Sequence, residues 1–259
     1  MGGYSVLQVP NIRASRILLT RGARLTIRHP PLMETAMPQT TFPLHDRTVG
    51  EIAARLPGAS GVFRRFGIDF CCHGEVPLAE AANRRQLDLG ALEAVLGDLD
   101  PLAIPDAPRE TGALIDHIQT RYHQAHRRQI PELIALSRKV EAVHAGHPEV
   151  PGGLADLLQR IWGELEVHMK KEELILFPAM RRQAADRIAV PIAEMRHDHD
   201  DHGAFLAELA RLTQDHTVPE GACRTWQALY AGTAQLRADL MEHIHLENNV
   251  LFPRFEKGA

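Results

Sequence analysis

Two stretches of this chain read His168-Met-Lys-Lys-Glu172-Glu-Leu-Ile-Leu-Phe177-Pro178 and His243-Ile-His-Leu-Glu247-Asn-Asn-Val-Leu-Phe252-Pro253. Both contain a histidine, a glutamate four residues later, and a Phe-Pro pair five residues after the glutamate. A separation of four residues on an α-helix places two side chains on one face, one above the other. Each stretch therefore offers an imidazole and a carboxylate to one point, and the repeat predicts two helices that face each other across a core.

The helices before these stretches repeat as well. His123-Gln-Ala-His126 matches His199-Asp-Asp-His202, and each pair begins 45 or 44 residues before the histidine of the next of these stretches. The two helical hairpins are therefore in register, and at ~1.5 Å per residue their histidines reach a similar height along a bundle. All four helices offer histidine to one layer of the core.

This set of donors predicts a two-metal centre. Imidazoles and a share of two carboxylates give each metal nitrogen and oxygen ligands, which suit ferrous and ferric iron, and a glutamate can bridge two ions. The set contains no thiolate, which argues against a closed structural zinc site. A single His-x-x-x-Glu pair is usually a solvated contact on a helix surface. Two copies in register would be costly to bury without a metal.

The residues alone leave open which histidine of each pair points inward. The apolar line from Ile115 to Val140 passes nearer to His126, and Leu209 likewise favours His202. A kink or bulge at Pro131 would shift the phase of the first helix and reverse this choice.

The remaining histidines are expected outside the ligand set. His117, His197, His216 and His245 are interpreted as surface residues or neighbours of ligands. His144 lies about 31 Å along the helix from His123 and is expected to cap the helix end. The apolar residues after the two glutamates are expected in the core, namely Leu174, Ile175, Leu176, Phe177, Leu246, Val250, Leu251 and Phe252.

Turn signals and composition predict an all-α protein. Aromatic residues make up only 5% of the chain, and no window shows sustained alternation of β-branched residues. Gly and Pro separate four long helical patterns, over residues 112–144, 152–180, 185–215 and 220–255. Short connections between long helices imply antiparallel neighbours, so residues 111–257 are predicted to form an up-down four-helix bundle.

The preceding region predicts a small helical domain over residues 44–100. Thr48 and Glu51 have the spacing of a capping box, and the turn at 67–74 carries the adjacent Cys71 and Cys72. Three prolines indicate a stiff linker over 101–110. Residues 1–43, with five arginines and no acid in the first 33, are expected to be a disordered basic extension unless translation starts at Met33 or Met37.

Charge and hydropathy exclude several classes. The formal charge is -4 without a long basic run after residue 40, so nucleic acid is not an expected partner. No stretch approaches the ~18 apolar residues of a membrane span. Three cysteines, two of them adjacent, do not make the framework of a secreted disulfide protein, so a cytoplasmic location is expected.

Cys71 and Cys72 have two interpretations. They are an incidental buried pair, since adjacent thiols close only a strained eight-membered disulfide ring, or they are a thiol pair that hands over metal or changes redox state. Cys223, alone on the last helix, is expected in the core.

These motifs resemble the iron-sulfur cluster repair di-iron proteins, also called repair-of-iron-centres proteins. Thr48-Val-Gly-Glu51 through Cys71-Cys72-x-Gly74 resembles the small cysteine-bearing domain of that family. Its hemerythrin-like domain is similar to Arg121-Tyr122-His123, Leu133 through His144, His168-Met-Lys-Lys-Glu172, Glu194 to His199, and Leu246 through Pro253. The resemblance covers residues 44–256 and implies a hemerythrin-like bundle with two iron ions, bridged by an oxo group and by carboxylates.

The resemblance also implies a ligand set and a function. It favours the first histidine of each pair, and its ligands fall on His123, His168, Glu172, His199, His243 and Glu247. The implied function is repair of iron-sulfur clusters damaged by nitrosative or oxidative stress in the bacterial cytoplasm, by donation of iron to damaged or apo proteins. Cys71 and Cys72 would then take part in iron transfer.

Two other functions use the same centre. One is a di-iron reductase of nitric oxide or peroxide, and the other is a hemerythrin-like sensor that binds dioxygen. Whether the protein is an enzyme, whether it forms a homodimer and which client it serves stay open at this point.

Overall fold

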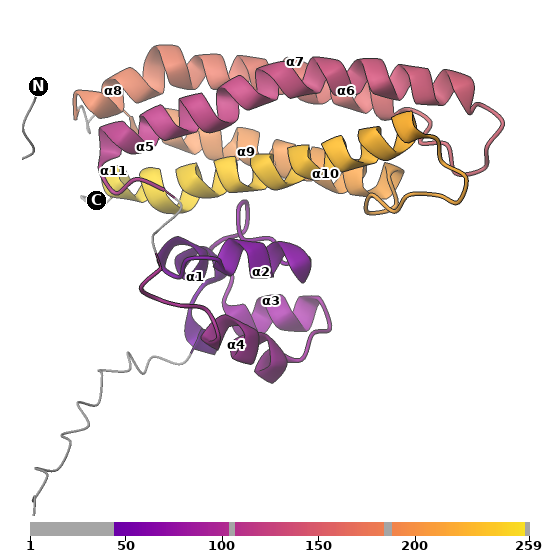
Figure 1. Ribbon diagram of the computed structural model, residues 1–259. Helices are drawn as coiled ribbons and strands as arrows, with labels where there is room; N and C mark the ends of the chain where they lie inside the picture. The colour runs from indigo at the N-terminus through magenta and orange to yellow at the C-terminus, as the bar shows by residue number, and fades with distance from the viewer. Residues whose placement is uncertain (1–43, 104–106, 184–187, 257–259) are drawn as a thin grey trace, which may run out of the picture. The chain divides into compact units, whose positions relative to one another are not determined.

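The computed structural model describes residues 44–103, 107–183 and 188–256, which belong to one compact unit of the chain (Figure 1). The expected basic extension at 1–43 lies outside the described residues. Within them the chain forms helices and turns, with an isolated β-bridge between Thr48 and Pro77 and no strand. The predicted all-α class is confirmed. No helix of the described part is long and apolar enough to cross a bilayer.

Four long helical segments form the bundle, and three of them contain a short π-helical turn. The first consists of α5 (Thr111–His117), η2 (Ile118–His123) and α6 (Gln124–Val143), and the second of α7 (Leu154–Lys171), η3 (Glu172–Leu176) and α8 (Phe177–Arg181). The third is α9 (Ala189–Leu212), and the fourth consists of α10 (Arg224–His245), η5 (Leu246–Leu251) and α11 (Pro253–Glu256). Helix α6 packs on α7 and α10, and α9 packs on the same two helices, as an up-down bundle requires.

The π turns lie at the predicted ligands. In the second and fourth segments the N–H groups of Phe177 and Phe252 bond to the carbonyls of Glu172 and Glu247, five residues back. A proline follows each phenylalanine, and its ring would collide with the carbonyl four residues earlier in a regular helix. A widened turn removes this collision, so each Phe-Pro pair explains the π turn before it.

The first segment contains a π turn at a place that the sequence did not indicate. The N–H of Gln124 bonds to the carbonyl of Gln119, whereas Pro131 lies inside the regular helix α6. One extra residue in a turn rotates the next part of the helix by about 100°. The phase shift considered for Pro131 therefore occurs before His123, and it buries both His123 and His126.

Four short helices precede the bundle. They are α1 (Val49–Arg55), α2 (Ala59–Arg65), α3 (Leu78–Arg84) and α4 (Leu89–Gly97), after a 3-10 turn η1 (Leu44–Asp46). The Thr48 side chain caps α1 as expected, because its Oγ1 accepts from the N–H of Glu51 at 3.2 Å. Phe63, Phe70 and Leu92 are buried and hold the short helices together.

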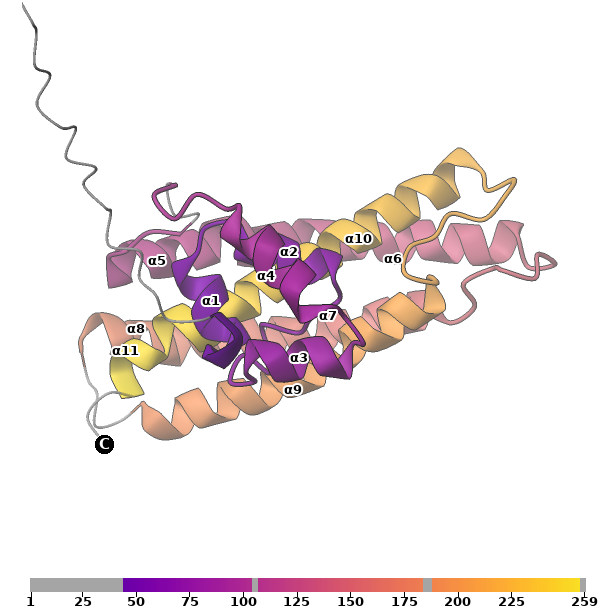
Figure 2. The same cartoon turned by 90° about the horizontal axis from the view of Figure 1, so that it is seen from below.

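This helical cluster contacts the α9 and α10 side of the bundle (Figures 1 and 2). Asn249 of η5 donates to the carbonyl of Phe70 at 2.9 Å, and Arg64 pairs with Glu242 at 2.7 Å. A Cβ on Gly50 would stand 2.5 Å from Oδ1 of Asn249, so only glycine allows this approach. Polar contacts to backbone thus fix the loop that carries the thiols.

Several side chains lie where the sequence did not predict them. Leu174 and Ile175 are 74% and 61% exposed, because the π turn directs them to solvent; Val250 is only partly buried. His245 is 2% exposed, since Phe70 of the helical cluster covers its ring. Cys223 is not a core residue but the N-cap of α10, and it is half-buried. The other predicted core residues after the two glutamates are buried.

Candidate metal centre

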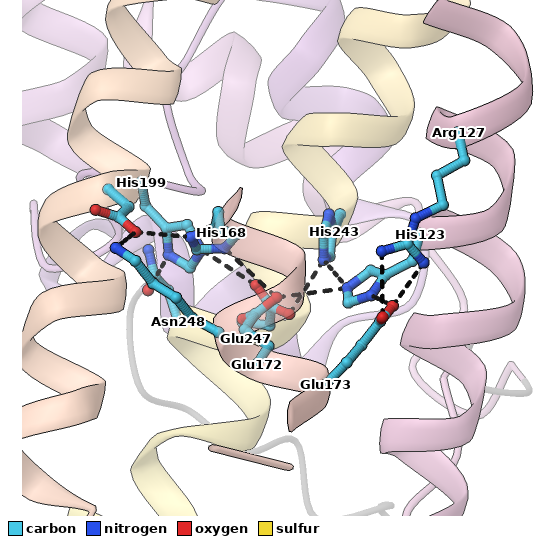
Figure 3. A network of polar contacts seen from close by, with 11 residues as sticks. His123, Arg127, His168, Glu172, Glu173, His199, His243, Glu247 and Asn248 are labelled. Atoms are coloured by element: carbon cyan, nitrogen blue, oxygen red, sulfur yellow. Dashed lines mark hydrogen bonds and ion pairs between the residues drawn. The ribbon is translucent and has the colours of Figure 1, made fainter. Parts of the chain in front are cut away.

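Six buried side chains from all four helical segments meet in one layer of the bundle. Glu172 and Glu247 lie in the middle, between one pair of imidazoles on either side (Figure 3). The structure brings together two groups of four donors, each within 4.8 Å of one another: His123 and His243 with both glutamates, and His168 and His199 with both glutamates. Each group takes one imidazole from each hairpin and shares both carboxylates.

The distances show how the carboxylates connect the two groups. Glu172 Oε2 lies 3.5 Å from Nε2 of both His123 and His168. Glu247 lies 3.1 Å from Nε2 of His199 through one oxygen and 3.1 Å from Nε2 of His243 through the other. Each glutamate therefore contacts one imidazole in each of the two groups. A carboxylate that bridges two metal ions needs this arrangement.

Within each group the two imidazoles face each other through Nε2. The separation is 3.0 Å for His123 and His243 and 3.1 Å for His168 and His199. Lone pairs that converge this closely need a proton or a cation between them.

The buried carboxylates test whether cations fit here. Neither oxygen of Glu172 has a hydrogen-bond partner among the described residues, although the side chain has no exposed surface. Burial and the neighbouring charge of Glu247 raise the pKa of Glu172 well above its usual value. An unpartnered buried carboxylate is costly, and a cation at each group would satisfy it. The residues present therefore fit two metal ions.

Polar neighbours hold three of the imidazoles by their outer nitrogen. Nδ1 of His123 lies 2.8 Å from Glu173, Nδ1 of His168 lies 3.1 Å from Asp198, and Nδ1 of His199 lies 2.9 Å from Oδ1 of Asn248. Such contacts fix the ring and leave Nε2 directed at the centre.

Sequence reasoning missed these partners, although each is adjacent in the chain to a predicted ligand. Glu173 follows Glu172, Asp198 precedes His199, and Asn248 follows Glu247. A polar residue beside a ligand is the signal that would have found them. Hydrogen bonding to His123 and the charge of Arg127 lower the pKa of Glu173 to about 2, so this partner is ionised.

His126 and His202 are buried but belong to neither group. Their ring centres lie 5.4 Å from that of His243 and 4.9 Å from that of His168, respectively. The apolar periodicity therefore predicted correctly that His126 and His202 point into the bundle. Only the first histidine of each pair, His123 or His199, reaches the carboxylates. His144 caps α6 with its backbone N–H, as expected, and its ring lies 3.2 Å from Cys223 Sγ.

The thiol pair lies beside the centre. Cys71 and Cys72 are free, with sulfur atoms 3.6 Å apart, and Asp69 accepts from both of their N–H groups. The Cys72 thiol lies 3.3 Å from the carbonyl oxygen of His199. Asn248, which holds the His199 ring, also donates to the carbonyl of Cys71 at 2.9 Å. One amide therefore connects the thiol loop to a predicted ligand.

Comparison with known proteins agrees with the fold and the site. Residues 114–255 match the model of the hemerythrin HHE cation binding domain, and residues 45–100 match a domain of unknown function. The bundle thus defines a hemerythrin-like cation-binding protein.

Similar proteins extend over both regions. The "Iron-sulfur cluster repair protein YtfE" of Edwardsiella ictaluri is 47% identical over 214 residues, which cover 81% of this chain and 96% of that protein. Proteins of the same name from Dickeya chrysanthemi and Escherichia coli are each 46% identical, over 82% of this chain and 98% of their own length. The chain belongs to the hemerythrin-like family of iron-sulfur cluster repair proteins.

Proposed function

We propose that this protein holds two iron ions and repairs iron-sulfur clusters damaged by nitric oxide or oxidative stress by donating iron. One observation carries the proposal: two buried carboxylates each contact imidazoles of two facing groups, and a free thiol pair lies beside one of these groups. The printed name of the relatives supports the same function. Residues 44–100 and 111–257 are proposed as two domains, joined by the linker at 101–110.

Each ion has its own imidazoles in this proposal. His123 and His243 would hold one ion, His168 and His199 would hold the other, and Glu172 and Glu247, which belong to both groups, would be shared between them. When bound, two iron ions joined by an oxo group and both carboxylates would supply one-electron redox chemistry and a ferrous state that exchanges ligands readily.

The surrounding side chains keep the donors in place and keep bulk water out. The rings of Phe177 and Phe252 stack on His123 and His199, with centres 5.8 Å and 6.0 Å apart. Tyr122 stacks on His243 in the same way, at 5.7 Å. These aromatic faces leave the imidazoles little freedom to rotate, so the layer is organised before a metal arrives.

Cys71 and Cys72 are proposed to take part in iron transfer to a damaged or apo iron-sulfur protein. Their sulfur atoms and Asp69 form a third group of donors. Soft thiolate ligands bind ferrous iron and are the ligands of iron-sulfur clusters themselves. Free thiols of this kind persist in a reducing compartment, which supports a cytoplasmic location.

The bridging glutamates provide the decisive test. Glu172→Leu and Glu247→Leu should each lower the iron content and abolish reactivation of a cluster protein treated with nitric oxide. Glu132→Leu, at an exposed glutamate of α6, is the matched control. This variant should keep the iron content and the reactivation activity of the parent protein. Full reactivation by both bridge variants contradicts the proposal.

The same assays separate the other two functions. Repeated turnover of nitric oxide or peroxide without loss of iron favours a reductase. Full biological activity in the Cys71→Ser/Cys72→Ser protein favours a sensor that binds dioxygen, because such a sensor has no use for the thiols.

A further inference from the structure

A cavity outside the metal centre lies between the helical cluster and the α9 and α10 side of the bundle (Figures 1 and 2). Its volume is about 370 Å³, and small-molecule sites occupy about 300–1,000 Å³. Buried apolar side chains form part of its wall, including Leu206 of α9 and Met241 of α10. We call it the arginine pocket, and the charged residues and thiols of its wall are Arg64, Asp69, Cys71, Cys72, Arg85, Arg211, Asp215 and Arg237.

The arginine pocket carries an excess of positive charge. Its wall contains four guanidinium groups but only two carboxylates. Arg64 pairs with Glu242 at 2.7 Å, and Arg237 pairs with Asp215 at 3.5 Å. These two arginines are therefore largely neutralised within the protein.

The other two arginines have no ion pair among the described residues. Arg85 caps the end of α3, Arg211 lies in the last turn of α9, and both are exposed. Asp69 does not neutralise them, because its carboxylate accepts from the N–H groups of Cys71 and Cys72. A guanidinium binds a carboxylate through two parallel hydrogen bonds, so the pocket is suited to a molecule with two carboxylates.

The thiol loop presents one sulfur atom to the arginine pocket. Both cysteines line it, but Cys71 is buried whereas Cys72 is half-buried. A Cβ on Gly203 of α9 would stand 3.0 Å from Cys72 Sγ, so the glycine leaves room for this thiol beside the helix. A molecule in the pocket therefore meets the sulfur of Cys72 before that of Cys71.

We propose that the arginine pocket binds a small anionic thiol with at least two carboxylates, and that the disulfide form of this thiol reacts with Cys72. The carboxylates pair with Arg85 and Arg211, and the sulfur lies against Cys72 Sγ. This site goes beyond the proposed donation of iron and does not depend on it, because no metal takes part.

The reaction is a thiol–disulfide exchange. The Cys72 thiolate attacks the nearer sulfur of the small disulfide, so a bond between Cys72 Sγ and that sulfur forms while the original disulfide bond breaks. The other half leaves as a thiolate with the electron pair, and it takes up the proton that Cys72 gave to water. Attack by a second small thiol on the bound half reverses the step and restores the Cys72 thiol.

Cys71 does not compete efficiently with this second thiol, because adjacent cysteines close only a strained eight-membered ring. Cys72 therefore stays in the mixed disulfide until a small thiol arrives. The mixed disulfide protects its sulfur from irreversible oxidation.

The test follows this exchange at each cysteine of the full-length protein. Glutathione disulfide is the probe, because each half has two carboxylates and one sulfur. The modified peptides are quantified by mass spectrometry over time. We expect the adduct at Cys72 and not at Cys71, while Cys223, which is outside the pocket, reports the reaction of a thiol without a binding site. Equal modification of Cys71 and Cys72 contradicts the inference.

Two arginines are changed together, and two neighbouring arginines provide the matched control. Arg85→Gln/Arg211→Gln should slow the exchange at Cys72 by roughly tenfold, because the attraction for the carboxylates is lost. Arg65→Gln/Arg84→Gln removes the same charge at exposed positions that do not line the pocket, and this protein should react like the parent. An unchanged rate in the first variant, or equal slowing in both, would overturn the inference.

A neutral reagent separates loss of binding from a disturbed loop. Hydroxyethyl disulfide has no carboxylate, so the parent and Arg85→Gln/Arg211→Gln should react with it at the same rate at Cys72. If the variant is slower with this reagent as well, the arginines shape the loop and do not bind the ligand.

Competition identifies the class of ligand. S-methylglutathione has the carboxylates but cannot exchange, so it should slow the reaction of Cys72 with glutathione disulfide and leave that of Cys223 unchanged. Inorganic phosphate at the same ionic strength should compete more weakly, because one phosphate does not reach both arginines. Equal competition by phosphate would show a site for any anion, and the proposed preference for a thiol would be wrong.

Discussion

The buried carboxyl group of Glu172 destabilises the metal-free protein. Its carboxyl group is fully buried and has no hydrogen-bond partner among the described residues, whereas Glu173 next to it is ionised and bonded on both sides. A buried polar group without a partner costs about 1–3 kcal/mol. Only a bound cation can offset this cost, so the Glu172 side chain serves binding rather than folding.

Leucine at position 172 should therefore stabilise the metal-free protein and weaken the iron-loaded one. We expect Glu172→Leu to raise the free energy of unfolding of the metal-free chain by about 1 kcal/mol, since an unpartnered carboxyl group is removed. Urea unfolding in the presence of a chelator measures this, and the iron-loaded proteins are compared in parallel. A metal-free variant less stable than the parent would show that the carboxyl group stabilises the fold after all.

Cys223 should react at lower pH than an ordinary thiol. Backbone N–H groups of Trp226 and Thr225 at the start of α10, together with the His144 ring, lower its pKa from the usual value of about 9 to about 7. Because the thiolate is the reactive form, alkylation should rise with pH and reach half of its maximum near pH 7.

Mass spectrometry of the Cys223 peptide after iodoacetamide treatment at several pH values gives this midpoint. His144→Ala should move it upward, because one hydrogen bond to the thiolate is lost. Cys71 is the internal control, since hydrogen bonding to Cys72 and burial raise the pKa of its thiol. A Cys223 midpoint above pH 8 in the parent protein would contradict the expectation.

Residue spacing predicted four of the six candidate donors but not the polar neighbours that hold them. His168 with Glu172, and His243 with Glu247, could be paired because four residues on a helix share a face. The contact between His123 and Glu173 joins residues 50 positions apart, and the position of Glu173 beside Glu172 marks the residue without indicating which imidazole it holds. Long-range contacts of this kind depend on how the helices pack, which the spacing of one helix does not contain.

At the level of elements, the π turns determine which side chains face the centre. The four helical segments could be predicted because their apolar periodicity is long and their breaks contain Gly and Pro. The turn at 118–123 could not, because one inserted residue changes the phase without changing the residue types. Periodicity therefore left His123 and His126 as alternatives, and it wrongly predicted Leu174 in the core.

Deletion of one residue from η2 tests this role of the π turn. Thr120 is exposed and bonds only to the helix backbone, at Asp116 and His117. Without it the turn should become a regular α-helix and rotate the preceding residues by about 100° relative to His123. We expect unchanged helix content by circular dichroism but a loss of at least one of two bound iron ions.

Thr120→Ala is the control, because it keeps the number of residues and should keep both ions. If the deletion protein binds two ions as tightly as the parent, the π turn does not position the ligand and His123 reaches the centre by another route.

At the level of the whole molecule, close backbone contacts fix the thiol loop on the bundle. Gly50 donates its N–H to the carbonyl of Gly74, and both glycines pack against Asn249 of η5. The sequence predicted a small helical region with a cysteine-bearing turn. It did not predict where this region contacts the bundle, because part of the contact is made by backbone carbonyls and glycines, which no apolar pattern marks.

Gly50→Ala should loosen this contact. The added Cβ would stand 2.5 Å from Oδ1 of Asn249 and 2.8 Å from the carbonyl of Gly74, and relief of such overpacking typically costs 1–3 kcal/mol, so we expect a loss of about that size. Cys72 should then alkylate faster, and trypsin should cut more readily after the exposed Arg109 of the linker.

The matched control is Gly97→Ala, where an added Cβ meets nothing within 4 Å. Iron content should stay the same in both variants, because neither glycine touches the donor layer. Identical alkylation and proteolysis rates in the two variants would show that the Gly50 contact does not hold the loop.

The sharing of donors between the hairpins has a consequence for how the protein arose. Because each group of donors takes one imidazole from each hairpin, a single hairpin would have neither group complete and would need a second copy of itself to form one. Tandem duplication of an ancestral gene for such a self-pairing hairpin accounts for both the repeat and the register. Two fused copies can diverge separately, and at matching positions the first carries Arg127 where the second carries Gly203, while Asp200 and Asp201 stand where the first carries Gln124 and Ala125.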